Sequence, residues 1–251
     1  MNPLDLEKVR LFVNDNIDDF HERKLASVQR LTLAKLLAKN PYLFKAKNIN
    51  SAGELIAGLL DAFLSSSEEK LFGDFLESLA VFVAGLTCNG HKSAAQGIDL
   101  EFIDNATHYI VSIKSGPNWG NSSQHKKLAQ DLRDGVTRIR QSRTGLNIQP
   151  VLGICYGKTR TAYTKEGYLK VVGQNFWYLI SGNPDLYLDI IEPIGYRAKE
   201  HNDKFMAGRA ALENKLTGEF IAAYCDSSGA INWEQFVRAN SENRDLDELL
   251  P

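Results

Sequence analysis

The chain has 251 residues, of which 43% are hydrophobic, and its net charge at pH 7 is −2. This length is sufficient for one domain with an appendage or for two small domains, and the near-neutral charge argues against a protein that coats nucleic acid indiscriminately. Three widely separated cysteines argue against a disulfide framework or a zinc site and suit a reducing compartment, so we expect a cytoplasmic protein.

The N-terminal part, residues 1–64, is predicted to be helical. Apolar residues recur at helical spacing between residues 4 and 37. A second helix is expected over residues 51–63, because Ser51 and Glu54 have the spacing of a capping box.

A third, apolar helix is predicted from Leu71 to Val83, after a break at residues 65–68. It contains Glu77, and a lone acid in such a helix is costly to bury unless it is paired or binds a metal. Alternatively, Glu77 simply lies on the solvent face. The apolar stretch is interrupted by acids and too short to span a bilayer, and no signal-peptide run opens the chain, so no membrane association is expected.

Residues 97–114 predict a β-hairpin with an acid and a base on one face. If the turn is centred between Asn105 and Ala106, cross-strand partners have numbers that sum to about 211, so Asp99 faces Ser112 and lies diagonally close to Lys114. A carboxylate can bind Mg²⁺, and a lysine can orient or deprotonate a water and neutralise developing charge, as phosphodiester hydrolysis requires. A solvated cross-strand ion pair is the structural alternative.

A polar loop, residues 115–124, follows the lysine and leads into a basic helix. The loop offers amide groups and one aromatic face that can touch base edges or the DNA backbone: Asn118, Trp119, Asn121 and Gln124. The helix carries seven basic or imidazole side chains, which either contact phosphate or form an ordinary solvated face: His125, Lys126, Lys127, Arg133, Arg138, Arg140 and Arg143.

Two further strands are predicted at residues 150–156 and 168–172, and the polar loop between them contains Arg160. This loop could enter a DNA groove or could be an exposed hairpin loop. The element order predicts an α/β (α+β) fold in which helices flank a central mixed sheet. We expect a nuclease core that contains the hairpin over residues 65–200 and a helical C-terminal region over residues 201–251, the whole chain forming one compact unit.

Three strings within residues 97–124, GIDLEF, YIVSIKSG and PNWGNSSQ, resemble the active-site region of type II restriction endonucleases of the PD-(D/E)XK nuclease superfamily, most closely the PmeII-like enzymes. A looser likeness extends from about Phe72 to about Gly182. The resemblance implies that Asp99 binds Mg²⁺ and that Lys114 is the catalytic lysine. Ser112 departs from the pattern, because the superfamily usually has Asp or Glu at this position.

The second metal carboxylate must then come from elsewhere, or metal binding would be weak. Glu77 and Glu101 are the candidates. Enzymes of this superfamily often place a helix glutamate at the metal, which favours Glu77. Glu101, two residues after Asp99, is otherwise an ordinary outward-facing strand residue.

We therefore expect Mg²⁺-dependent cleavage of double-stranded DNA at a short, palindromic site by a homodimer, since two identical subunits place one active centre on each strand. A sequence-specific DNA-binding protein that does not cleave, because of Ser112, is one alternative. A repair or junction-resolving nuclease on the same fold is another. The absence of a phosphate-cradling loop and of a dinucleotide fingerprint argues against a nucleotide cofactor.

Overall fold

The computed structural model describes residues 1–142, 145 and 147–243, so Arg143 lies outside the described residues. Contacts divide the chain into two compact units. The first comprises Met1–Phe20 and Leu71–Tyr196, and the second comprises His21–Lys70 and Arg197–Pro251. Two helices, α1 (Leu6–Gln29) and α4 (Ala52–Cys88), contribute residues to both units.

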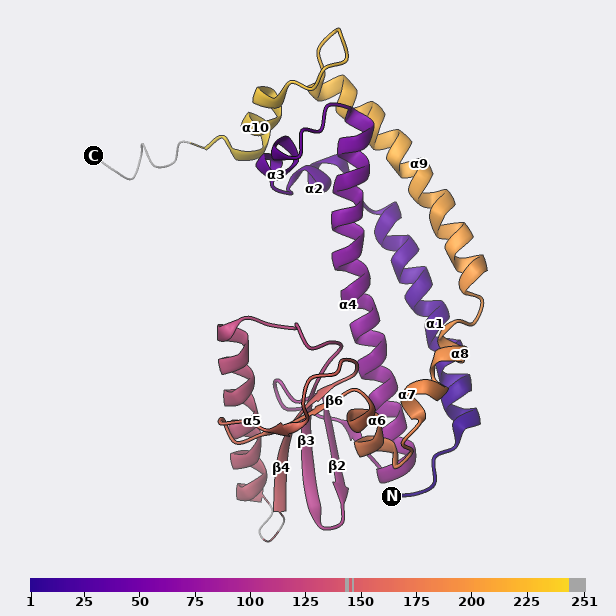
Figure 1. Cartoon of the computed structure of the whole chain (residues 1–251), viewed down its shortest axis with the longest axis vertical. Helices are drawn as coiled ribbons and strands as arrows, with labels where there is room; N and C mark the ends of the chain where they lie inside the picture. The colour runs from indigo at the N-terminus through magenta and orange to yellow at the C-terminus, as the bar shows by residue number, and fades with distance from the viewer. Residues whose placement is uncertain (143–144, 146, 244–251) are drawn as a thin grey trace, which may run out of the picture. The chain divides into compact units, whose positions relative to one another are not determined.

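A six-stranded mixed sheet lies at the centre of the first unit, with the strand order β1-β2-β3-β4-β6-β5 (Figure 1). Strands β3, β4 and β6 are parallel, and the other pairs are antiparallel. This confirms the predicted mixed sheet. The strands are β1 (His91–Lys92), β2 (Leu100–Asp104), β3 (Thr107–Lys114), β4 (Asn147–Ile154), β5 (Ala162–Tyr163) and β6 (Leu169–Val172).

The predicted hairpin is formed by β2 and β3, and its register is confirmed. Leu100 pairs with Val111, so partner numbers sum to 211. Asn105 and Ala106 form the two-residue turn with positive φ angles of 46° and 59°, the combination that a type I′ turn requires. The alternation along the strands therefore places Asp99, Ser112 and Lys114 on one face.

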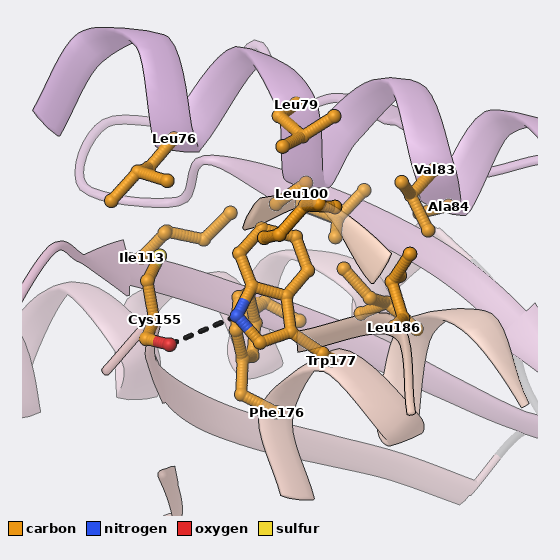
Figure 2. Packing of buried hydrophobic residues seen from close by; sticks show 14 of the residues in the cluster. Leu76, Leu79, Val83, Ala84, Leu100, Ile113, Cys155, Phe176, Trp177 and Leu186 are labelled. Atoms are coloured by element: carbon orange, nitrogen blue, oxygen red, sulfur yellow. Dashed lines mark hydrogen bonds between the residues drawn. The ribbon is translucent and has the colours of Figure 1, made fainter. Parts of the chain in front are cut away.

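Helices cover both faces of this sheet. On one face, α5 (Ser122–Ser142) buries Leu128, Leu132 and Ile139. On the other face, the second half of α4 packs with α6 (Gln174–Ser181), where the Trp177 indole donates a 2.9 Å hydrogen bond to the Cys155 carbonyl oxygen (Figure 2). Two short helices follow, α7 (Leu186–Asp189) and α8 (Ile191–Ile194).

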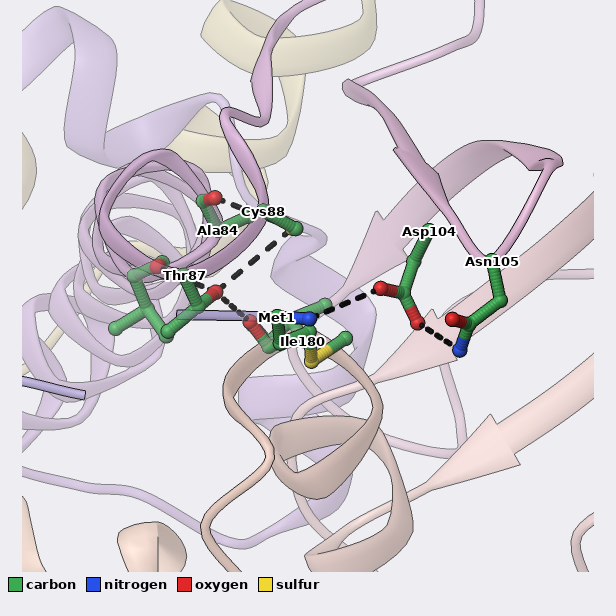
Figure 3. A network of polar contacts seen from close by, with 8 residues as sticks. Met1, Ala84, Thr87, Cys88, Asp104, Asn105 and Ile180 are labelled. Carbon is green, nitrogen blue, oxygen red and sulfur yellow. Dashed lines mark hydrogen bonds and ion pairs between the residues drawn. The ribbon is translucent and has the colours of Figure 1, made fainter. Parts of the chain in front are cut away.

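Polar contacts secure the turn end of the hairpin and the end of α4. The amino group of Met1 lies 3.2 Å from the Asp104 carboxylate, and the Thr87 hydroxyl donates to the Ile180 carbonyl oxygen in α6 over 2.5 Å (Figure 3). Asp104 stands at the opposite end of the hairpin from Lys114, so these contacts stabilise the scaffold away from the candidate site.

Within the described residues, the second unit consists of helices and one isolated β-bridge between Cys225 and Ile231. Its core is built from the end of α1, the first part of α4, and four other helices. These are α2 (Leu33–Leu37), α3 (Pro41–Ala46), α9 (Ala198–Tyr224) and α10 (Trp233–Ser241).

The predicted break at residues 65–68 is wrong, because α4 is one continuous helix of 37 residues. Ser66 is accommodated in it by a 3.1 Å hydrogen bond from its hydroxyl to the Ala62 carbonyl oxygen. By length and composition alone, α4 could cross a membrane, which corrects the expectation that its apolar stretch is too short. Leu59 and Leu79, however, are fully buried in the cores of the two units, as in a core helix.

Candidate active site at the carboxyl ends of the parallel strands

The three parallel strands β3, β4 and β6 end at one edge of the sheet, and the loops that follow them pack closely together. Gly116 lies so near the Tyr156 ring that a side chain at position 116 would clash with it. Gly157, with φ of +126°, lies close to Pro117, where an added Cβ atom would be 3.2 Å from the Pro117 Cγ atom. The polar loops after Lys114 and after β4 therefore form one continuous surface.

Asp99 is held rigidly at this edge, directly before β2. Its amide donates a 2.8 Å hydrogen bond to the Val111 carbonyl oxygen. Its carboxylate oxygen Oδ2 accepts a 2.6 Å hydrogen bond from the Ile113 amide and a 3.3 Å hydrogen bond from the Ser112 hydroxyl. Ser112 is only 1% exposed, so it supports Asp99 from within the sheet.

Lys114 is the last residue of β3, and its ammonium lies near Trp119 in the polar loop, residues 115–124. The Nζ atom is 5.6 Å from the centroid of the Trp119 ring, and the Trp119 ring in turn lies 4.3 Å from the His125 ring. The half-buried Trp119 therefore connects the candidate catalytic lysine with the first turn of α5.

Glu77 approaches from α4, which covers the other face of the sheet. One turn earlier in this helix, a Cβ on Gly73 would lie 3.7 Å from the Ser115 Cβ atom, so this part of α4 adjoins the end of β3. The Glu77 carboxylate forms a 3.1 Å ion pair with Lys92. Glu77 and Asp99 thus come to the sheet edge from opposite faces.

Lys92 also lies at this site, although the sequence pattern does not point to it. The hydrogen bond to Glu77 raises the pKa of the Lys92 ammonium most, and the charges of Glu77, Asp99 and Asp74 raise it further. Lys92 therefore lies within the electrostatic range of both predicted metal-binding carboxylates. No motif marks it in the sequence, because it precedes the recognisable strings and is brought to them only by strand pairing with β2.

Glu101 is not the outward-facing strand residue that the sequence suggests, because it is only 8% exposed. Its cross-strand partner Ile110 belongs to the core beneath α5, so the Glu101 side chain is enclosed on that face. The carboxylate contacts Arg138 at 2.9 Å and His108 at 3.1 Å, and it accepts a hydrogen bond from Ser93. These contacts occupy both of its oxygens and attach α5 to the hairpin.

Burial alone would raise the pKa of Glu101, but the hydrogen bonds from Ser93 and Arg138 hold it below its ordinary value of 4.5. A lowered folded-state pKa contributes stability that is complete above 4.5 and is lost as the pH falls through the folded-state value. We expect Glu101→Gln to lower the free energy of unfolding at pH 7 by about 2 kcal/mol.

Denaturant unfolding of both proteins at pH 7 and at acidic pH measures this effect, and the difference should shrink below pH 4.5. Glu234→Gln removes a solvent-exposed ion pair with Arg238 and should change stability by only a few tenths of a kcal/mol. If the loss of unfolding free energy in Glu101→Gln were the same at both pH values, the ionised form of Glu101 would not be the source of the stability.

Asn121 and Gln124 cap helix α5. The Asn121 side-chain oxygen accepts 3.1 Å hydrogen bonds from the Ser123 and Gln124 amides, and the Gln124 side-chain oxygen accepts a 2.8 Å hydrogen bond from the Asn121 amide. This reciprocal arrangement satisfies amides that a helix start leaves free. The predicted DNA contacts of both residues are thus combined with a structural role.

We expect Asn121→Ala to destabilise the protein by about 1 kcal/mol, whereas Asn121→Ser should preserve most of the cap. Thermal unfolding of the two variants measures this difference. The Ser variant retains the cap but lacks the amide, so its affinity for DNA reports base or backbone contact separately from folding. Equal stability of the two variants would contradict the capping role.

The other predicted DNA-binding residues are exposed around the same edge. Asn118 precedes the cap, and Lys126 and Lys127 lie in the first turns of α5, where Lys127 also pairs with Asp131. Arg160 is exposed in the loop after β4. These residues are far apart in the sequence, and the close packing of the two loops brings the loops that carry Asn118 and Arg160 together.

Within the described part of the chain, no group of three or more His, Cys, Asp or Glu side chains is arranged to hold a metal ion. Asp99 and Glu77 offer oxygen donors of the kind that Mg²⁺ prefers, and Mg²⁺ is often bound by one or two carboxylates with several waters. The ammonium of Lys92 at this position indicates that the local charge stabilises a cation. The donor atoms of these two residues are of the type that a Mg²⁺ ion with few protein ligands uses.

The mixed sheet flanked by helices, with Asp99 and Lys114 on its central hairpin, defines a restriction-endonuclease-like fold. The family model for type II restriction endonuclease EcoO109I matches residues 7–202, and the chain belongs to this family. The chain is accordingly a restriction endonuclease, a nuclease whose substrate is double-stranded DNA. No curated protein gives a significant match. The closer likeness to PmeII-like enzymes stays a prediction.

Proposed function

We propose that this protein is a cytoplasmic, Mg²⁺-dependent type II restriction endonuclease that cuts both strands of a short palindromic DNA sequence as a homodimer. The observation that carries the proposal is the hairpin. The Ile113 amide donates a hydrogen bond to the Asp99 carboxylate, and Lys114 lies one residue further on, at the end of β3. A polar loop and a basic helix follow directly.

Asp99 and Glu77 are the residues that would hold Mg²⁺. The ion, when bound, polarises the phosphate and lowers the pKa of a bound water. Glu101 is the weaker candidate for the second carboxylate, because its oxygens are engaged by Arg138, His108 and Ser93. Ser112 supports Asp99 through its hydroxyl rather than supplying a ligand charge.

Lys114 would act on the attacking water and on the phosphate. Its ammonium carries positive charge to the end of β3, where it can neutralise charge that develops on the phosphate oxygens. The Trp119 ring on one side of it limits access of bulk water, which strengthens electrostatic interactions at this point.

The surface around Lys114 would bind the DNA. Lys126, Lys127 and Arg160 carry charges suited to phosphate oxygens, and these contacts position the duplex without reading its sequence. Asn118 and Trp119, with Asn121 and Gln124, offer groups suited to base edges. A two-fold symmetric site then requires two copies of the chain, because each copy contributes one reactive centre.

Digestion of a supercoiled plasmid with purified protein, in Mg²⁺ and in a chelator, tests this proposal. The proposal predicts that linear DNA forms when Mg²⁺ is present and that no cleavage occurs in the chelator. Specific binding without any cleavage would favour the DNA-binding alternative, in which Ser112 has abolished the reaction. Preferential cutting of branched over linear duplexes would favour a junction-resolving nuclease.

A further inference from the structure

Lys92 forms an ion pair with Glu77, one of the two carboxylates of the candidate centre. Its Nζ atom lies 3.1 Å from Glu77 Oε1. The neighbouring residue Ser93 donates its amide to the Asp99 carbonyl oxygen over 3.3 Å, so the backbone fixes Lys92 close to Asp99 as well.

The exposure of the two partners is unequal. The Lys92 side chain is 72% exposed and Glu77 is 27% exposed. Lysine has a long, flexible stem, so an ammonium in this position can leave the carboxylate without any change in the fold. Glu77, in contrast, is fixed on α4 and keeps its place.

An ammonium and a metal ion compete for the same carboxylate. A lysine within hydrogen-bond distance of Glu77 Oε1 uses the lone pairs that a metal would use, and it repels a divalent cation at the same time. The competition matters more in this chain than in one with a third acid, because Ser112 stands at the position of the usual carboxylate and leaves Glu77 as the second ligand.

We propose that Lys92 is a tethered counter-ion of the metal centre, which neutralises Glu77 before the metal binds and is displaced from it by the divalent cation. This inference rests on the proposed function, because it takes Glu77 and Asp99 as the metal-binding pair. Lys92 accordingly competes with the metal for Glu77, and this competition sets the metal concentration at which the centre fills.

Mn²⁺ binding to the full-length protein without DNA, measured by isothermal titration calorimetry, tests this inference directly. Lys92→Gln removes the competing charge, so it should tighten Mn²⁺ binding by about threefold to tenfold. Lys92→Arg keeps the charge and should bind Mn²⁺ close to the wild-type affinity. Unchanged or weaker binding to Lys92→Gln would overturn the inference.

A matched control is available in the same unit. Lys8 forms a similar exposed ion pair with Asp5, at 3.2 Å and with 62% of the lysine side chain exposed. Lys8→Gln should leave Mn²⁺ affinity unchanged. Tightening by Lys8→Gln equal to that by Lys92→Gln would show a general charge effect and would overturn the inference.

Two further variants separate this inference from the proposed function. Asp99→Asn and Glu77→Gln should each weaken Mn²⁺ binding, and in the Glu77→Gln background Lys92→Gln should no longer tighten it. If neither acid variant changes Mn²⁺ binding, the proposed metal site fails. If both weaken it but Lys92→Gln has no effect, the metal site stands and the role of Lys92 fails.

Discussion

Asp99→Asn is expected to reduce DNA cleavage by about three orders of magnitude or more, because it removes the carboxylate charge that would bind Mg²⁺. DNA affinity should be unchanged or higher, since one negative charge near the phosphate is lost. The fold should be preserved, because the Asn oxygen can still accept the hydrogen bond from the Ile113 amide.

Single-turnover cleavage in Mg²⁺ and equilibrium binding in Ca²⁺ measure the two quantities separately. Asp134→Asn, which changes an exposed acid on α5, is the matched control and should cleave normally. Full activity of Asp99→Asn would remove this residue from the metal site.

Among the other acids, Glu77→Gln should lose most of the cleavage activity and Glu101→Gln should lose little. The opposite order would transfer the ligand role to Glu101.

Lys114→Ala is expected to slow the chemical step by about two to four orders of magnitude with little change in DNA affinity. In the proposed mechanism the lost ammonium would act on the reacting water and phosphate, whereas Lys126, Lys127 and Arg160 would remain to bind the DNA backbone. The same pair of measurements, single-turnover cleavage in Mg²⁺ and equilibrium binding in Ca²⁺, separates these effects.

Lys165→Ala, which removes an exposed lysine in the turn between β5 and β6, is a control for the loss of one positive charge. It should cleave at nearly the wild-type single-turnover rate. The assigned roles would be wrong if Lys114→Ala lost DNA binding while alanine variants of Asn118 and Trp119 lost only the cleavage rate. The loop would then act in the reaction and the lysine in DNA binding.

The hairpin could be predicted from sequence because its determinants are local. The two-residue turn at Asn105 and Ala106 and the alternation on either side of it are enough to set the register that pairs Leu100 with Val111. The same locality explains the confirmed cap at Ser51, whose hydroxyl accepts a 3.2 Å hydrogen bond from the Glu54 amide.

Features that depend on tertiary contacts could not be predicted. The burial of Glu101 follows from α5 covering its face, and its partner Arg138 is 37 residues away. The continuity of α4 across Ser66 follows from core residues on both sides of the serines, which local propensity does not reveal. Residues 1–20 belong to the unit that contains the sheet, because Val9 and Val13 pack into its core. Their helical spacing predicts a helix but does not show against which element that helix packs.

The function that we propose for this chain is cleavage of DNA at a defined, two-fold symmetric sequence through Asp99 and Lys114. The most direct test is digestion of a DNA of known sequence in Mg²⁺, followed by mapping of the cut ends on both strands. We expect every cut to fall at one short sequence, with positions on the two strands related by two-fold symmetry, and Lys114→Ala to leave the DNA intact. Cuts at unrelated sequences, or the same cleavage pattern from Lys114→Ala, would contradict the proposed function.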